Sequence, residues 1–259
     1  MATSLFNKII FGPIISRRLG VSLGVNLLPT DSKLCNFNCV YCECGWTKKD
    51  DSKGKQHFND KKDVLSLLEQ VLSQRVEKGE TLDVITFAGN GEPTMHPDFA
   101  EIIDETIALR NRYFPKVKIA VLSNATMLGR ESVREALAKV DRAILKIDSA
   151  FDDTIKAINN PLGNYSLDAV IKNMSLFKGE IIIQTMFLRG VNNGVAIDNT
   201  TEKEVSAWLD VLKQVKPSQV MVYSLDRDTP LETLTKVPKE ELKKIASQVV
   251  AAGFECSVA

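Results

Sequence analysis

The sequence predicts an α/β protein whose strands form a parallel sheet. Six short, β-branched and apolar stretches alternate with segments whose apolar residues recur at helical spacing, and this alternation is typical of βαβ units. Polar and glycine-rich motifs follow directly after several of these stretches, at the end of the strands where a barrel carries its active-site loops. The length of 259 residues suits one such domain.

The first expected strand, at residues 19–28, is rich in β-forming residues and is closed by Pro29. A helix is expected at residues 63–76, where apolar residues have helical spacing and Asp60 can serve as N-cap. The stretch at 82–88 is short, apolar and β-branched, as in a buried strand.

The same criteria predict the remaining elements. Strands are expected at 117–122, 142–147, 180–188 and 219–225, and helices at 98–112, 131–139, 166–177, 206–215 and 240–251. The tail at 254–259 can add a short strand, residues 189–193 are expected to form a loop, and Phe11-Gly12-Pro13 to form a turn. We expect one domain at 1–259, with an N-terminal segment (1–18), a barrel core (19–230) and a C-terminal helix and tail (231–259).

The overall charge argues against two classes of partner. Lys and Arg together number 33, as do Asp and Glu, so the formal net charge is +0 and no whole-molecule field attracts nucleic acid or anionic membrane. No apolar run approaches the ~20 residues of a membrane span. Ser16 to Gly20 resembles a twin-arginine export signal, but the apolar stretch after it is short and interrupted. Reduced thiols favour a reducing compartment, so we expect a cytoplasmic protein.

Cysteines are concentrated in one short loop. Cys35, Cys39, Cys42 and Cys44 lie within ten residues, whereas Cys256 is far away. Soft sulfur ligands select zinc or iron–sulfur clusters. The Cys-x3-Cys-x2-Cys spacing offers three ligands, and because a [4Fe–4S] cluster is normally held by four thiolates, three would leave one iron open to a small molecule.

The sequence disfavours two other uses of these cysteines. A disulfide framework is disfavoured by five cysteines in a long chain without a signal peptide. A structural zinc site would need Cys44 as its fourth ligand, and the sequence lacks the second pair of cysteines that such sites usually have. If Cys44 is a ligand, the open iron is lost.

The loop of Cys35, Cys39 and Cys42, with Tyr41 before the third cysteine, resembles the signature of the radical S-adenosylmethionine (radical SAM) superfamily. In that superfamily the open iron binds the amino and carboxylate groups of S-adenosylmethionine, and reductive cleavage releases a 5′-deoxyadenosyl radical. The resemblance implies a [4Fe–4S] cluster and S-adenosylmethionine as cofactors, and the incomplete (β/α)6 TIM-like barrel of the superfamily.

Two further stretches support this resemblance. Gly89, Asn90, Gly91 and Glu92 follow the second strand and resemble the motif that holds the amino group of S-adenosylmethionine. The stretch 11–20 resembles the opening of the iron–sulfur oxidoreductases related to the tRNA wyosine-synthesis enzymes. The wyosine-type enzymes carry a second cluster, for which this chain has no spare cysteines, so a wyosine-synthase activity is not expected.

Polar residues at the strand ends complete the expected site. Ser123, Asn124 and Asp148 suit hydrogen bonds to a ribose or carboxylate, although turn formation and helix capping would also explain them. The expected cofactor-pocket residues beside the glycine motif are Tyr41, Ser123, Asn124, Asp148 and Gln184. The expected substrate residues are Arg17, Arg18, Arg189, Tyr223, Asp226 and Arg227, whose arginines suit a phosphate or carboxylate.

These observations favour a radical SAM enzyme with one cluster, an external electron donor of the flavodoxin or ferredoxin type, and an unidentified, anionic substrate that is either small or macromolecular. One alternative within the superfamily is an activase that generates a radical on a protein partner. An alternative from another class is a non-catalytic iron–sulfur electron carrier or metal-binding module.

Overall fold

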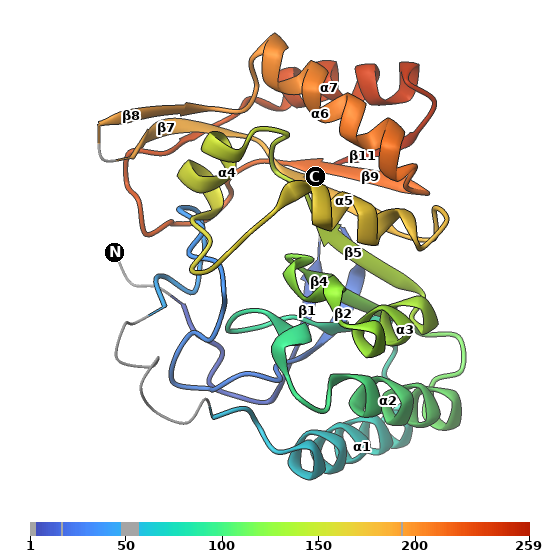
Figure 1. Cartoon of the computed structure of the whole chain (residues 1–259). Coiled ribbons are helices and arrows are strands. Elements are labelled where there is room, and N and C mark those ends of the chain that lie inside the picture. The colour runs from blue at the N-terminus through green and yellow to red at the C-terminus, as the bar shows by residue number, and fades with distance from the viewer. Residues whose placement is uncertain (1–3, 17, 48–56, 193) are drawn as a thin grey trace.

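The computed structural model describes residues 4–16, 18–47, 57–192 and 194–259. Its centre is an eight-stranded sheet in the order β1-β2-β3-β4-β5-β6-β9-β11, which curls into a partial barrel (Figure 1). The strands are β1 (Ile10–Ser16), β2 (Gly20–Val25), β3 (Val84–Phe87), β4 (Lys118–Ser123), β5 (Arg142–Lys146), β6 (Ile182–Met186), β9 (Gln219–Tyr223) and β11 (Glu255–Val258).

The six predicted strands are β2 to β6 and β9, which lie side by side in chain order and run parallel. The predicted tail strand is β11, which is parallel to β9. The parallel partial barrel that the resemblance implied is therefore confirmed. Its carboxyl ends all meet at one edge, which is where the predicted motifs follow the strands.

Helices pack against the outside of the curled sheet (Figure 1). They are α1 (Lys61–Glu77), α2 (Phe99–Tyr113), α3 (Glu131–Lys139), α5 (Leu167–Ser175), α6 (Glu202–Val215) and α7 (Lys239–Ala251). The main core joins sheet residues such as Leu23 and Ile85 to helix residues such as Leu68 and Ile102. Asp60 caps α1 as predicted, because its side chain accepts the Lys62 N–H. Among the described residues, no helix is long and apolar enough to cross a membrane.

A small antiparallel sheet and helix α4 (Asp152–Asn159) were not predicted. Residues 189–192 of the expected loop at 189–193 belong instead to β7 (Leu188–Asn192), and residue 193 lies outside the described residues. Strand β7 pairs with β8 (Val195–Asp198) and β10 (Thr235–Lys236) in a small antiparallel sheet. An Asn-Gly dipeptide at 193–194 lies between the two strands, and this is a strong hairpin signal. Helix α4 is only two turns long, which leaves few apolar positions from which a helix could be predicted.

The turn predicted at Phe11-Gly12-Pro13 lies inside strand β1 instead. The pairing of β1 with β2 is antiparallel and shifts register between Phe11 and Ile14, and Gly12 has φ +95°. Glycine tolerates this conformation, so the strand continues through a bulge where an ordinary residue would be strained. As a result, the N-terminal segment forms a wall beside β2.

Candidate active site

A cavity of about 330 Å³ lies among the loops that follow the parallel strands. It brings together most of the site residues that the sequence predicts: Arg18, Cys35, Cys39, Tyr41, Cys42, Gly89, Gly91, Glu92, Ser123, Asn124, Gln184, Tyr223 and Arg227. It is also lined by Cys44 and by two lysines, Lys33 and Lys146, that the sequence analysis did not single out.

The cysteine loop is joined to the glycine motif by its backbone. Leu34 donates its N–H to the Asn90 carbonyl at 2.8 Å, and Glu92 donates its N–H to the Leu34 carbonyl at 3.2 Å. Gly91 has φ +143°, and a Cβ at this position would lie 1.8 Å from the Leu34 oxygen. Only glycine allows this close approach. The two motifs therefore hold a fixed position relative to each other.

The other side of the cysteine loop is held by the end of α4. Asn38 donates its N–H to the Asn160 carbonyl at 3.0 Å, and Val40 donates its N–H to the Ile158 carbonyl at 2.9 Å. The loop therefore has a support on each side, although it has no regular secondary structure.

The thiols of the loop differ in their electrostatic surroundings. Burial raises the pKa of Cys35 and of Cys39. A hydrogen bond from the Cys44 thiol, assisted by the Lys33 ammonium, lowers the pKa of Cys42. The Lys33 ammonium itself is buried and donates to the Gly45 carbonyl at 2.8 Å. The loop thus contains its own positive charge beside sulfur atoms that become anionic when they bind a metal.

Among the described residues, no three His, Cys, Asp or Glu side chains converge as ligands of one metal ion. The side chains of Cys35, Cys39 and Cys42 all line the cavity. The Cys44 sulfur lies 3.4 Å from the Gly89 carbonyl oxygen, so Cys44 contacts the glycine motif.

Glu92 is a buried carboxylate that connects the ends of β3 and β4. It accepts hydrogen bonds from the Ser123 hydroxyl at 2.8 Å, from the Asn124 N–H at 2.6 Å and from the Thr94 N–H at 3.1 Å. Burial raises its pKa, although these hydrogen bonds oppose the rise. The donors fix the carboxylate in one orientation on the cavity wall, where it can accept an ammonium group.

Asn90 does not line the cavity, although the sequence predicted it in the cofactor pocket. Its side-chain oxygen accepts the Phe6 N–H at 2.9 Å, and its side-chain nitrogen donates to the Pro29 carbonyl at 2.7 Å. Asn90 therefore fastens the N-terminal segment to the glycine motif. The backbone direction that decides this orientation is not visible in the sequence.

Asp148 lies behind the cavity wall and holds Tyr41. The Tyr41 hydroxyl donates to one oxygen of Asp148, which also accepts from the Asn159 amide at 2.7 Å. The other oxygen accepts the Met186 N–H at 2.9 Å. The Asn159 amide nitrogen is also 3.5 Å from the Cys39 sulfur. Asp148 thus positions the residues beside Cys39 and has no direct exposure to the cavity.

A largely buried cation, Lys146, lies next to this carboxylate. Its Nζ is 3.7 Å from Asp148 and donates to the Tyr223 hydroxyl at 3.1 Å. Burial lowers the pKa of Lys146, but Asp148 and further neighbours outweigh this effect and raise it on balance. Lys146 precedes Asp148 by two residues, so the alternation of a strand places both on one face. That spacing could have identified Lys146 from the sequence.

Two of the predicted substrate residues do not line this cavity, and a third cannot be placed. Arg189 is paired with Asp198 and Glu241, where it joins the small sheet to α7, and it does not line the cavity. Asp226 accepts from the Lys236 ammonium at 3.1 Å and lines a neighbouring cavity. Arg17 lies outside the described residues.

Comparison with protein families gives one match that spans most of the chain. The model of the radical SAM superfamily matches residues 31–212, which include the cysteine loop and the glycine motif. A UPF0026 protein of Synechocystis is 33% identical over 227 residues, which are 86% of this chain and 77% of that protein. A UPF0026 protein of Methanocaldococcus jannaschii is 31% identical over 238 residues, 90% of this chain and 68% of that protein. The chain also matches the GTPase Obg of Brachyspira hyodysenteriae at 26% identity, but spans only 33% of its length.

Solved structures share the fold at low sequence identity. A radical SAM methyltransferase from Sphaerobacter thermophilus has a TM-score of 0.66 at 15% identity, over 92% of this chain and 65% of that chain. SuiB of Streptococcus suis, solved with bound S-adenosylmethionine, has a TM-score of 0.60 at 15% identity, over 91% of this chain and 46% of that chain. These likenesses concern the fold, and the family match covers both motifs of the site. The chain belongs to the radical SAM superfamily.

Proposed function

We propose that this protein is an enzyme that binds one [4Fe–4S] cluster through Cys35, Cys39 and Cys42 and uses S-adenosylmethionine to abstract hydrogen from an anionic substrate. The observation that carries the proposal is the backbone pairing of Leu34 with Gly91, which places the three-cysteine loop and Glu92 on one cavity. When bound, the cluster and S-adenosylmethionine supply a 5′-deoxyadenosyl radical.

The protein's own residues supply binding and orientation. Glu92, held by Ser123 and Asn124, is placed to accept the ammonium group of the methionine part of S-adenosylmethionine. Tyr41 and Gln184 line the same cavity and limit the access of water to it. We assign Asp148 to the positioning of Tyr41, because they share a buried hydrogen bond.

On the substrate side, the candidates that lie at the cavity are Arg18, Tyr223 and Arg227. The guanidinium groups of Arg18 and Arg227 favour an anionic substrate. An external donor of the flavodoxin or ferredoxin type is needed, because reductive cleavage consumes an electron and the described chain offers cysteines for only one cluster.

The test is the formation of 5′-deoxyadenosine. The protein is reconstituted anaerobically with iron and sulfide, reduced with dithionite and given S-adenosylmethionine. We expect 5′-deoxyadenosine from the wild type and none from Cys39→Ala. The matched control is Cys256→Ala, because Cys256 lies on β11, outside the cavity lining, and this variant should retain the product.

The other functions predict different results. A non-catalytic carrier or metal-binding module would give no product, and a cluster that requires Cys44 as a fourth ligand would contradict the proposal. Cys44→Ala addresses this directly, since the proposal expects it to retain the cluster's absorbance and its product. An activase would cleave S-adenosylmethionine but would show hydrogen abstraction only from a partner protein.

A further inference from the structure

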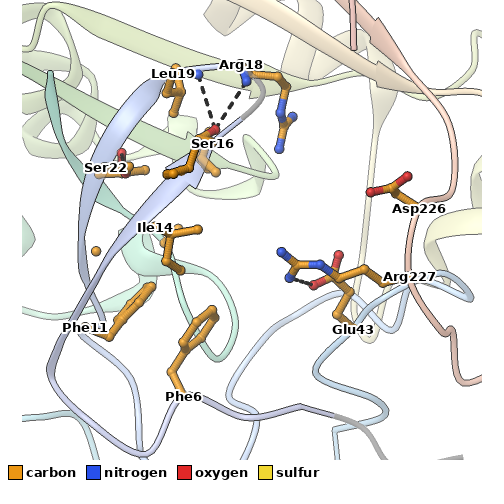
Figure 2. A pocket seen from close by; sticks show the side chains of 15 residues that line it. Phe6, Phe11, Ile14, Ser16, Arg18, Leu19, Ser22, Glu43, Asp226 and Arg227 are labelled. Atoms are coloured by element: carbon orange, nitrogen blue, oxygen red, sulfur yellow. Dashed lines mark hydrogen bonds and ion pairs between the residues drawn. The ribbon is translucent and has the colours of Figure 1, made fainter.

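A second cavity of about 270 Å³ adjoins the first. Both cavities share Phe6, Arg18, Glu43 and Arg227 in their lining. The second cavity lies between strand β1 and the loop after β9 (Figure 2). Phe11 and Ile14 line the second cavity and not the first, so the two spaces can be tested separately.

One wall of the second cavity is apolar and aromatic. The rings of Phe6 and Phe11 stack with centroids 3.8 Å apart and an angle of 21° between their planes, and Ile14 continues this wall (Figure 2). Phe11 also lies directly on Gly24, where a Cβ would be 2.2 Å from the ring. The glycine therefore lets Phe11 pack directly against the sheet, while Phe6 stacks on the Phe11 ring.

A cation stands where the two cavities meet. The Arg18 guanidinium lies 4.5 Å from the centre of the Tyr223 ring, and its Nη1 donates to the Gln184 side-chain oxygen at 3.0 Å. Within the part of the chain that the structure describes, no carboxylate forms an ion pair with Arg18. Lys146 lies behind Tyr223, 3.1 Å from its hydroxyl, and is paired with Asp148. Arg18 is therefore the cation that an anion can reach at the junction of the two cavities.

The rim opposite the aromatic wall is closed by an exposed ion pair. Arg227 donates to Glu43 at 2.6 Å (Figure 2), and their side chains are 60% and 46% exposed. Exposed pairs of this kind are weak. Arg227 can therefore leave Glu43 for another anion, and the rim can open without disturbing the core.

We propose that the second cavity binds the substrate, and that the substrate is an organic anion with an aromatic or similarly flat apolar body. The body lies against Phe6, Phe11 and Ile14, and the carboxylate or phosphate binds Arg18 at the junction with the first cavity. The assignment of this ligand as substrate rests on the proposed function. The existence of the binding site can be tested without it.

The test uses two fluorescent probes and the purified full-length chain. The anionic probe is 1-anilinonaphthalene-8-sulfonate, and the neutral one is N-phenyl-1-naphthylamine, which has the same rings without the sulfonate. We expect the wild type to bind the anion about tenfold more tightly, because a charge-assisted contact to Arg18 is available only to the sulfonate. Arg18→Gln should remove this preference, and its dissociation constant for the neutral probe should stay within about twofold of the wild-type value.

Two further variants locate the site. Phe11→Ala should weaken the binding of both probes if they occupy the second cavity, because Phe11 lines the second cavity and not the first. The matched control is Arg112→Gln, an arginine on the outer helix α2 that pairs with Glu69, and it should bind both probes as the wild type does. If Arg18→Gln does not fold by circular dichroism, Arg18→Lys should keep the preference for the anion, because it keeps the charge.

Each result supports or overturns the proposal. Equal binding of the two probes by the wild type, or an anion preference that survives in Arg18→Gln, would overturn the role of Arg18. Unchanged binding in Phe11→Ala would overturn the location. Neither probe requires a cluster or S-adenosylmethionine, so these outcomes are distinguishable from a failure of the 5′-deoxyadenosine assay. Displacement of the anionic probe by aromatic carboxylates and by aryl phosphates then shows which anionic group the site prefers.

Discussion

Leu34 and Gly91 pair side by side as a short parallel bridge, and this contact joins the cysteine loop to the carboxylate of the glycine motif. The two hydrogen bonds of the bridge run from Leu34 to Asn90 and from Glu92 to Leu34. The pairing leaves no room for a side chain at position 91, since a Cβ would lie 1.8 Å from the Leu34 oxygen. Four predictions follow from this and related contacts.

Gly91→Ala should break the bridge. The added methyl group meets a backbone oxygen that cannot move alone, and the φ of +143° is strained for alanine. We expect a loss of about 2–3 kcal/mol in the free energy of unfolding, measured by urea denaturation, and loss of 5′-deoxyadenosine formation. Gly129→Ala is the matched control, because a Cβ there would meet nothing within 4 Å. If both variants behave alike, the close approach at Gly91 has no structural importance.

Tyr41→Phe should destabilise the protein by about 1 kcal/mol, the usual value of a buried hydrogen bond. The variant removes the hydroxyl that donates to Asp148, and this carboxylate is nearly inaccessible to water. Tyr113→Phe serves as comparison, because the Tyr113 hydroxyl donates to the partly exposed Glu69. This variant should lower the free energy of unfolding by less. Thermal unfolding of both variants measures the difference, and a larger cost for the Tyr113 variant would contradict the structure.

Lys146→Met should lower the free energy of unfolding by about 3 kcal/mol, because removal of one partner leaves the buried Asp148 without its counter-charge. The methionine keeps much of the apolar stem, so the loss reports the charge. Lys139→Met removes an exposed lysine that pairs with Asp104 and should change stability by less than about 1 kcal/mol. Denaturant titration of both variants at neutral pH provides the measurement. A neutral effect of Lys146→Met would mean that Asp148 is compensated by its hydrogen bonds alone.

Arg189→Gln should affect stability and leave the cavity intact. The Arg189 hydrogen bond lowers the pKa of Glu241, and the pKa of Asp198 is lowered because hydrogen bonds from Thr200 and Arg189 outweigh its burial. A carboxylate with a lowered pKa stabilises the fold above its usual pKa, and this stability is lost as the pH falls through the lowered value.

The variant should therefore be less stable than the wild type at pH 7 by about 1 kcal/mol or less, because these groups are about one-third exposed. The difference should shrink as the pH falls below about 4. Urea titrations at several pH values test this, with probe binding at pH 7 as the second readout. If Arg189→Gln failed to bind the anionic probe, Arg189 would belong to the substrate site after all.

The sheet could be predicted because its strands are short, β-branched and buried on both faces. The motifs could be placed because each follows a strand, as Glu92 follows β3 and Ser123 ends β4. The direction of individual side chains could not be derived in the same way. Asn90 belongs to the glycine motif yet points toward Phe6, because the backbone turns at Gly89 and Gly91.

Lys33 and Lys146 show a second limit of prediction from the sequence. Both resemble any other lysine in the sequence, and their positions depend on carbonyl, thiol and carboxylate partners that lie close only after folding. Arg189 shows the opposite case. Its position after a strand suggested an anion site, but a hairpin that was predicted as a loop supplies it with Asp198 as a partner.

The two supports of the cysteine loop become available at different times during synthesis on the ribosome. The support at Gly91 lies within the first hundred residues, whereas the support from Ile158 and Asn160 emerges much later. Because β2 to β6 are neighbours in the sheet in chain order, a nascent chain can pair the loop with the glycine motif while its other side still lacks a partner. The loop that carries the cysteines is therefore held on both sides only after the chain has passed α4.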